Sequence, residues 1–299
     1  MSCLTSAFVF RSILSRYDIY FQNLVTTWLI IMIAVVVLCF IVSEITRNYS
    51  QVDKLWSLVP IAYSWVTAAS AFSPRLLIMA ILVTIWGLRL SYNFSRKGGY
   101  NIIPWKGEED YRWKVMREHR ALKGRLRFGL FNFFFISLYQ NIVIFLFSSP
   151  LLLASLYRDK PLSIIDFLAA LFMLVFIMTE SIADNQLFKF HSEKKSADDQ
   201  GNLYKESLTK GFMTEGLWKH VRHPNFISEQ AIWICFYFFG VAAAGQLINL
   251  TIIGPLLLVL LFIGSTRLTE RISSSKYPGY AVYQKEVPRF IPGIFKRSR

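Results

Sequence analysis

Long runs of apolar residues, separated by charged segments, dominate the pattern of this chain. Several runs approach the roughly 20 residues that an α-helix needs to cross a bilayer. The fourth run is too long for one plain crossing, so a bend is expected near Ser148-Ser149-Pro150. The pattern predicts an all-α polytopic membrane protein with about seven transmembrane helices, at residues 24–43, 55–72, 74–93, 128–156, 162–180, 226–244 and 247–266.

The composition agrees with a membrane protein. The chain is 54% hydrophobic and only 17% charged, whereas a soluble domain normally has about 25% charged residues. Cys3, Cys39 and Cys235 have no ligand-like spacing and the four histidines form no metal pattern, so neither a disulfide framework nor a metal site is predicted. Arg11 and Arg16 interrupt the N-terminal segment, which indicates a retained first span rather than a cleaved signal.

The net charge of +14 could indicate a nucleic-acid partner, but its distribution indicates membrane topology instead. Most of the 33 lysines and arginines lie in residues 44–54, 94–127, 181–225 and 267–299, which share one face under the predicted spans. By the positive-inside rule this face is cytosolic. We therefore expect an N-terminus on the lumenal or outer side, a cytosolic C-terminus, a lipid bilayer as partner and no nucleic acid. Anionic lipid or an anionic cofactor would benefit from the basic surplus.

The predicted cytosolic segments also differ in character. Residues 108–127 alternate charged and apolar side chains, which predicts an amphipathic helix at the membrane interface. Residues 181–225 form a polar loop in this prediction. Residues 273–295 are rich in tyrosine and proline and are expected to be ordered.

A charged, helix-breaking cluster directly precedes the sixth apolar run. Pro224 favours an extended approach before it and starts a helix at once. Arg222, His223 and Asn225 would then be presented at a helix N-terminus, where a phosphate-bearing ligand binds well. A basic membrane flank would explain Arg222 alone. It explains Glu229, one turn inside the helix, less well.

Polar residues at the ends of the early spans need an explanation, because each must face the bundle interior or a wet cavity. Asp53 opens the second span, and Arg89 and Tyr92 end the third. Snorkelling to the interface would explain Arg89, and aromatic anchoring would explain an isolated Tyr92. Their roles stay open on these grounds alone.

Two further polar turns lie at the ends of later spans. Glu180 and Asp184 are four residues apart and share a helix face, where they could accept hydrogen bonds from ribose hydroxyls or pair with lysines. Arg267 and Arg271 have the same spacing, which suits a diphosphate clamp but also ordinary flank charges. No glycine-rich strand–turn–helix fingerprint is present, so a nucleotide would have to bind to helix ends and loops.

The segment GLWKHVRHPNFISEQ, residues 216–230, resembles the C-terminal signature of the steroid 5α-reductase-like membrane enzymes, in particular their DUF1295 branch. The Arg-His-Pro element alone is not specific, because isoprenylcysteine and phospholipid methyltransferases carry a similar one. The agreement extends to residues 52–60, 86–94, 109–113, 183–186 and 275–292.

This resemblance implies an NADPH-dependent reductase that saturates a carbon–carbon double bond in a sterol-like or other lipid α,β-unsaturated carbonyl. It implies an N-terminal segment at 1–23, a substrate side at 24–127 and a cofactor-binding membrane domain at 128–299. By motif position, the implied cofactor contacts are Asp184, Arg222, His223, Asn225, Glu229, Arg267, Arg271, Tyr277 and Tyr280.

Asp53 and Tyr92 match positions where the steroid reductases hold the substrate carbonyl with an acid and a tyrosine. Enolate charge develops on that oxygen during hydride transfer, and a phenol oriented by a carboxyl group can donate to it. The chain departs from the family's mammalian members at two positions. They carry glutamate where this chain has Asp53 and histidine where it has Arg271.

Two alternatives stay open. One is a membrane S-adenosylmethionine-dependent methyltransferase of the isoprenylcysteine type, and the other is a non-catalytic lipid-binding protein. The Asp-Asn-Gln element at 184–186 and the pair Asp53 and Tyr92 favour the reductase, because methyl transfer does not require them. The final residues 296–299, Lys-Arg-Ser-Arg, resemble a dibasic retrieval signal and predict the endoplasmic reticulum membrane in a eukaryote.

Overall fold

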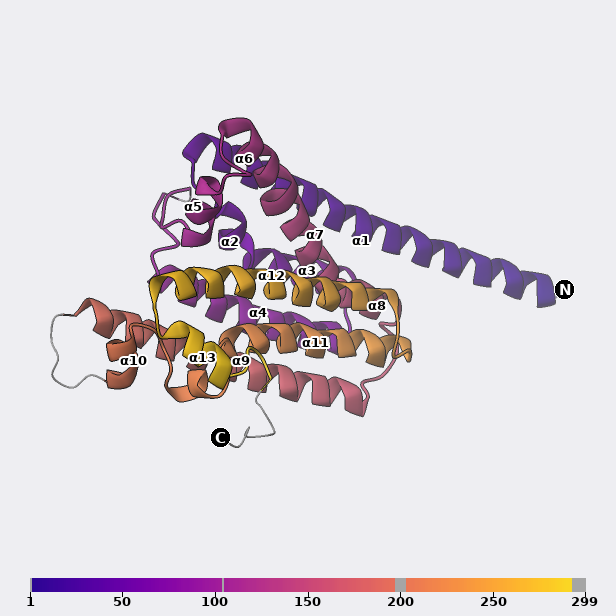
Figure 1. Cartoon of the computed structure of the whole chain (residues 1–299). Helices are drawn as coiled ribbons and strands as arrows, with labels where there is room; N and C mark the ends of the chain where they lie inside the picture. Colours follow the sequence, from indigo (N-terminus) through magenta and orange to yellow (C-terminus); the bar gives the residue numbers. More distant parts are fainter. Residues whose placement is uncertain (1, 104, 197–202, 292–299) are drawn as a thin grey trace. The chain divides into compact units, whose positions relative to one another are not determined.

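The computed structural model describes residues 2–103, 105–196 and 203–291, with side chains from residue 19 onward. Within this part of the chain every regular element is helical (Figure 1), which confirms the all-α prediction. The basic residues 296–299 lie outside the described residues, so the expected retrieval signal stays a prediction.

Six helical stretches of the described chain are long and apolar enough to cross a membrane, so the chain is a multi-pass integral membrane protein. The second predicted span, 55–72, is not among them: it falls on α2 (Gln51–Leu55) and α3 (Leu58–Ser70), and α3 has only 13 residues. The six stretches are Ile19–Thr46, Pro74–Arg96, Arg125–Leu156, Ile164–Lys195, Pro224–Ala244 and Leu250–Lys276.

The chain divides into two compact units, unit 1 with residues 1–170 and 236–255 and unit 2 with residues 171–235 and 256–299. These units do not coincide with the predicted division at residue 127. That division separates a substrate side from a cofactor-binding domain by function, and it stays a prediction. Unit 1 holds α1 (Ser2–Thr46), α2, α3, α4 (Pro74–Arg96), α5 (Tyr111–Glu118), α6 (Arg125–Phe131), η1 (Asn132–Tyr139), α7 (Gln140–Ser148), α8 (Pro150–Leu156) and η3 (Leu250–Ile252).

Unit 2 contains parts of three long helices together with shorter elements. It takes each long helix only within residues 171–235 and 256–299. The long helices are α9 (Ile164–Lys195), α11 (Pro224–Ala244) and α12 (Ile253–Lys276). The shorter ones are α10 (Lys205–Lys210), η2 (Gly216–Lys219) and α13 (Tyr280–Glu286).

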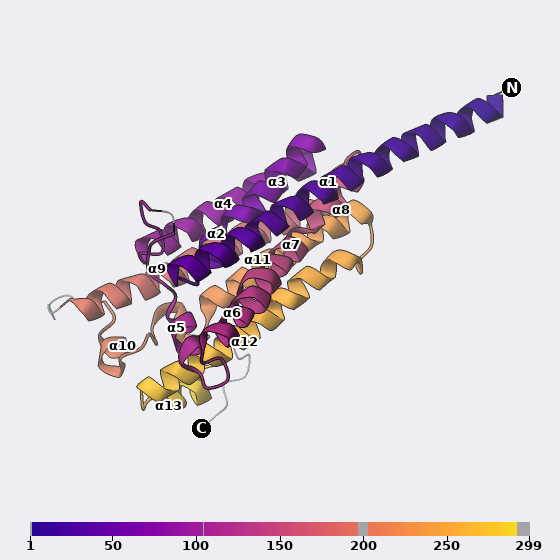
Figure 2. The same cartoon turned by 90° about the horizontal axis from the view of Figure 1, so that it is seen from above.

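A hairpin of α3 and α4 forms part of unit 1, and the two helices lie side by side in both views (Figures 1 and 2). Ser73 caps the start of α4 by accepting a hydrogen bond from the Leu76 N–H, and Pro74 occupies the first helical position. Gly87 allows the close approach, because a Cβ atom there would lie 2.7 Å from the Ser57 carbonyl oxygen.

A buried ion pair joins the start of α4 to the start of α9 inside unit 1. Arg75 Nε donates to Asp166 Oδ1 at 2.7 Å, and its Nη2 donates to Asp166 Oδ2 at 3.0 Å. Arg75 also donates to the carbonyls of Lys160 and Pro161. The two side chains are only 2% and 1% exposed. Arg75 therefore links the starts of α4 and α9 through a buried ion pair.

The polar segments depart from expectation in two places. The amphipathic helix expected at 108–127 is limited to α5, which Asp110 caps and which ends at Glu118, because His119 is extended. Gly124, with a φ of 112°, then precedes α6. α9 continues to Lys195, well past the predicted end at residue 180, so Asp184 is helical rather than in a loop. The interruption expected near Ser149 is present, because α7 ends at Ser148 and α8 begins at Pro150.

Candidate functional site

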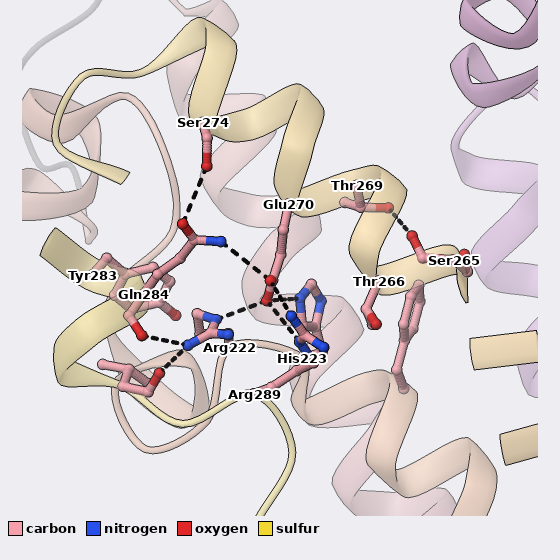
Figure 3. A network of polar contacts seen from close by, with 12 residues as sticks. Arg222, His223, Ser265, Thr266, Thr269, Glu270, Ser274, Tyr283, Gln284 and Arg289 are labelled. Carbon is pink, nitrogen blue, oxygen red and sulfur yellow. Dashed lines mark hydrogen bonds and ion pairs between the residues drawn. The ribbon is translucent and has the colours of Figure 1, made fainter. Parts of the chain in front are cut away.

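Unit 2 contains all the predicted cofactor residues, and unit 1 contains Asp53 and Tyr92. The predicted phosphate contacts Arg222 and His223 are engaged by a carboxylate that was not among the predicted site residues (Figure 3). Arg222 Nε donates to Glu270 Oε1 at 2.7 Å, and His223 Nε2 lies 3.0 Å from the same oxygen. Arg289 Nη2 donates to Glu270 Oε2 at 2.9 Å. Glu270 of α12 is thus the centre of this cluster.

The backbone reinforces the cluster. The Arg222 N–H donates to the Pro288 carbonyl at 2.9 Å, and the His223 N–H donates to the Arg289 carbonyl at 3.3 Å. Arg222 Nη1 also donates to the carbonyls of Gln284 and Val287. The extended approach that Pro224 imposes frees these N–H groups from helical bonding. The residues before α11 therefore hold α13 and the segment after it through these hydrogen bonds.

These contacts correct the expected role of two residues. Arg222 and His223 are 7% and 4% exposed, and both are directed at Glu270 rather than at an open anion site. A buried guanidinium stabilises the folded state only while its counter-charge and carbonyl partners remain, because desolvated charge is costly. We therefore assign Arg222 and His223 to holding unit 2 together.

A second polar group lies on α9 and the first two turns of α11. Asn225 Nδ2 donates to Asp184 Oδ1 at 3.2 Å, and Glu229 Oε1 accepts from Trp233 Nε1 at 3.2 Å. Asp184 and Glu229 are buried and Asn225 is half-buried. The structure therefore brings together Asp184 and Asn225 as the sequence suggested. Two carboxylates and an amide can accept from hydroxyl groups, and the amide can also donate.

The remaining predicted cofactor residues fall into two sets. Arg267 and Arg271 lie one turn apart on α12 with exposed side chains. Tyr277 and Tyr280 pack in an aromatic cluster with Phe212, and Lys194 Nζ donates to the Tyr277 hydroxyl at 3.1 Å. The arginines remain available to an anion, whereas Tyr280 is a packing residue.

Asp53 and Tyr92 are not joined by any of the described hydrogen bonds. Asp53 Oδ2 accepts from Trp113 Nε1 at 2.8 Å, while Tyr92 is 66% exposed and its ring lies 5.5 Å from the Arg96 guanidinium. Ser91 explains the separation, because its hydroxyl meets that of Ser57 at 2.8 Å. The next residue along a helix is rotated by about 100°, so Tyr92 turns away. The expectation that Asp53 orients this phenol is wrong.

The environment of Asp53 favours its neutral form. Burial raises the pKa of the Asp53 carboxyl, the charge of Asp110 raises it further, and Arg112 and Trp113 only partly oppose this. The neighbouring Asp110 behaves in the opposite way. Burial would raise its pKa, but the charge and hydrogen bonds of Arg112 bring the pKa below its usual value. The two carboxyls therefore differ in proton affinity.

Asp53→Asn should raise the thermal midpoint of the purified protein near neutral pH. Because folding raises the pKa of Asp53, its favourable contribution is present in acid and is lost as pH rises through the folded-state pKa. Asparagine can still accept from Trp113 but cannot ionise. Melting in detergent at about pH 7.5 and about pH 4.5 should show the difference at the higher pH only. An equal or lower midpoint at the higher pH would contradict this prediction. Glu108→Gln, an exposed change in the loop before α5, serves as control.

Comparison with known proteins places the chain in a family. Residues 39–287 match the family described as Protein of unknown function (DUF1295). The chain belongs to the DUF1295 family. It is also 40% identical over 266 residues to the Schizosaccharomyces pombe protein described as Uncharacterized protein C594.04c, covering 85% of this chain and 75% of that one. No solved structure matches it.

The matched region of this DUF1295 protein includes Asp53, Glu270 and every predicted cofactor residue, and it ends two residues before Arg289. Sequence reasoning missed Glu270 as a centre and treated Arg289 only as part of a motif. The available signal was the position of Glu270, three residues after Arg267 and beside Arg271 on the last span. A buried acid among basic residues indicates pairing.

Proposed function

We propose that this DUF1295 protein is an NADPH-dependent membrane reductase of the steroid 5α-reductase-like type. Its substrate would be a sterol-like or other lipid α,β-unsaturated carbonyl, and its product the same lipid with the carbon–carbon double bond saturated. The observation that carries the proposal is the buried polar group of Asp184, Asn225 and Glu229 on α9 and α11. These residues stand where the family resemblance implies cofactor contacts.

The residues present fit the cofactor. Asp184 and Glu229 can accept hydrogen bonds from ribose hydroxyls, and the Asn225 amide can donate to and accept from a carboxamide. Arg267 and Arg271 are exposed and one turn apart, so they can pair with phosphate groups. Arg222 and His223 are not in this set, because Glu270 occupies them. Bound NADPH would supply the hydride for the reduction.

Tyr92 and Asp53 remain the predicted substrate-side residues, in changed roles. The exposed phenol of Tyr92, at the end of a candidate span, can donate a hydrogen bond to a carbonyl oxygen. Arg96 beside its ring favours negative charge developing nearby. Asp53 would act only through the position of Trp113 and α5.

The hydrogen bond between Asp184 and Asn225 favours the reductase over methyl transfer, because it uses the Asp-Asn-Gln element. We also propose that the loops at 94–127 and the C-terminal segment face the cytosol, where NADPH is available, and that the protein resides in the endoplasmic reticulum membrane of a eukaryotic cell. The basic surplus of those segments supports this orientation.

Purified protein in detergent should bind NADPH, and Asn225→Ala should weaken binding by roughly tenfold or more, because the change removes one amide and leaves Asp184 without it. Titration calorimetry measures both affinities. Ser192→Ala, an exposed change on α9, is the matched control and should bind as tightly as the original chain.

The rival functions give different results in the same assay. Tight binding of S-adenosylmethionine with no binding of NADPH would establish the methyltransferase class and overturn the proposal. Binding of neither, with a cellular phenotype that survives Asn225→Ala combined with Glu229→Ala, would indicate a non-catalytic lipid-binding protein.

A further inference from the structure

A hollow in unit 1, distant in sequence from the cofactor residues, is lined mainly by arginines and aromatic rings. It lies where the candidate span Ile19–Thr46 ends and the candidate span Arg125–Leu156 begins, and α1 packs against η1 and α7 of that second span. Because one candidate span ends at the hollow and the other begins there, the hollow lies at the polar boundary of one membrane face. Its lining residues are Arg47, Tyr49, Arg117, Gly124, Arg125 and Phe128.

The backbone at Arg47 is unusual. Among the described residues other than glycine, Arg47 is the residue with a positive φ, 59°. A left-handed residue after a helix is commonly glycine, because a side chain there is strained. Arg47 nevertheless occupies the position and donates to Glu44 Oε2 and the Tyr49 hydroxyl, both at 3.2 Å. Backbone strain that is retained at a residue lining a hollow indicates that its side chain has a function there.

The second arginine is held in place by aromatic rings. The Arg117 guanidinium lies 5.1 Å from the centre of the Tyr49 ring and 5.9 Å from that of Phe128, and these rings meet edge to face. Arg117 also pairs with Glu109 and donates to the Arg47 carbonyl at 3.1 Å. A guanidinium oriented in this way loses little freedom when it binds a planar or tetrahedral anion. Arg117 is therefore prepared for an anionic ligand.

The charge around the hollow is strongly positive. Arg125 is exposed and forms no ion pair in the described part of the chain. The segment 114–127 also carries exposed Lys114, Arg120, Lys123 and Arg127, against the single acid Glu118. Glu44 and Glu109 neutralise only part of this charge. The surplus favours an anion with more than one oxygen to share among the arginines.

Apolar side chains beside the hollow indicate what else the ligand carries. Leu126 and Leu130 are one turn apart along the start of the candidate span and are 76% and 51% exposed. On the lipid-facing start of a span, such residues contact acyl chains. Gly124, which also lines the hollow, leaves open space, since a Cβ atom there would meet nothing within 4 Å. The ligand that fits has an anionic head and an apolar tail.

We propose that this hollow binds the phosphate headgroup of an anionic phospholipid, with Arg47, Arg117 and Arg125 around the phosphate and the acyl chains along Leu126 and Leu130. The site is independent of the proposed reductase activity. It would anchor the junction of two spans to one leaflet, because basic pockets at helix ends recognise lipid headgroups.

The test uses the full chain reconstituted in nanodiscs of phosphatidylcholine with a minor fraction of phosphatidic acid, and native mass spectrometry of the lipids that stay bound. The original protein should retain phosphatidic acid in clear preference to phosphatidylcholine. Each of Arg117→Gln and Arg125→Gln should lower this preference about fivefold. Arg127→Gln is the matched control, because Arg127 is exposed near the hollow but does not line it.

Arg125 keeps the proposal testable if Arg117→Gln does not fold, because its side chain is exposed. Leu126→Asn with Leu130→Asn should weaken retention of the lipid, because it removes the apolar contacts for the acyl chains. Equal loss in Arg127→Gln and Arg125→Gln would overturn the proposal by showing a diffuse charge effect. Displacement of the lipid by millimolar glycerol phosphate would overturn it in favour of a soluble phosphate ligand.

Discussion

Glu270→Gln should destabilise the folded protein by about 3–5 kcal/mol, because it removes the negative charge shared by two guanidiniums and an imidazole. Arg222, His223 and Glu270 are all buried, so water cannot replace the lost charge. Thermal melting in detergent measures the loss. Hydrogen exchange should at the same time show deprotection of residues 280–291, which are clipped to this cluster.

Arg271→Gln provides the matched control for this prediction. It changes the next residue of the same helix, also from charged to amide, but its side chain is exposed. Its effect should stay within about 0.5 kcal/mol. If Glu270→Gln melts like the original chain and residues 280–291 stay protected, the cluster contributes no stability and the phosphate role of Arg222 has to be reconsidered.

Asp166→Ala should cost unit 1 about 3–5 kcal/mol for a related reason, because it strands the Arg75 guanidinium in a site that is 2% exposed. The double variant Arg75→Leu with Asp166→Leu should recover most of the loss, since burying apolar side chains needs no counter-charge. Melting midpoints of the single and double variants, with Glu118→Gln as an exposed control in the same unit, measure this. A double variant as unstable as the single one would show that the carbonyls of Lys160 and Pro161 need the arginine.

The spans could be predicted from the sequence because each depends on a local property, the length of an apolar run. α3 shows the limit of that property. Its neighbours make residues 55–72 look like one apolar run, but the helix is interrupted between Leu55 and Leu58. α9 shows the opposite error, because polar residues beyond position 180 continue the helix once the apolar part has started it.

The partners of the charged residues could not be predicted, because they are distant in sequence. Arg75 and Asp166 are 91 residues apart, and Arg222 and Glu270 are 48 apart. The hydrophobic pattern predicts which face of a helix is buried. It does not predict which charged residue of another helix that face contacts. The failure at Tyr92 has a similar origin, since one position along α4 separates a residue that faces Ser57 from one that is exposed.

The hydrogen bonds from Arg222 to later residues also have a consequence for the biosynthesis of the protein. Its carbonyl partners lie 62 and 65 residues later in the chain, so they do not yet exist when Arg222 leaves the ribosome. During that interval the guanidinium has to remain in water or at the lipid headgroups, because it cannot be buried alone. Biosynthesis therefore leaves unit 2 open until residues 284–289 arrive. A chain that ends before residue 284 would lack these acceptors, so Arg222 could not be buried in it.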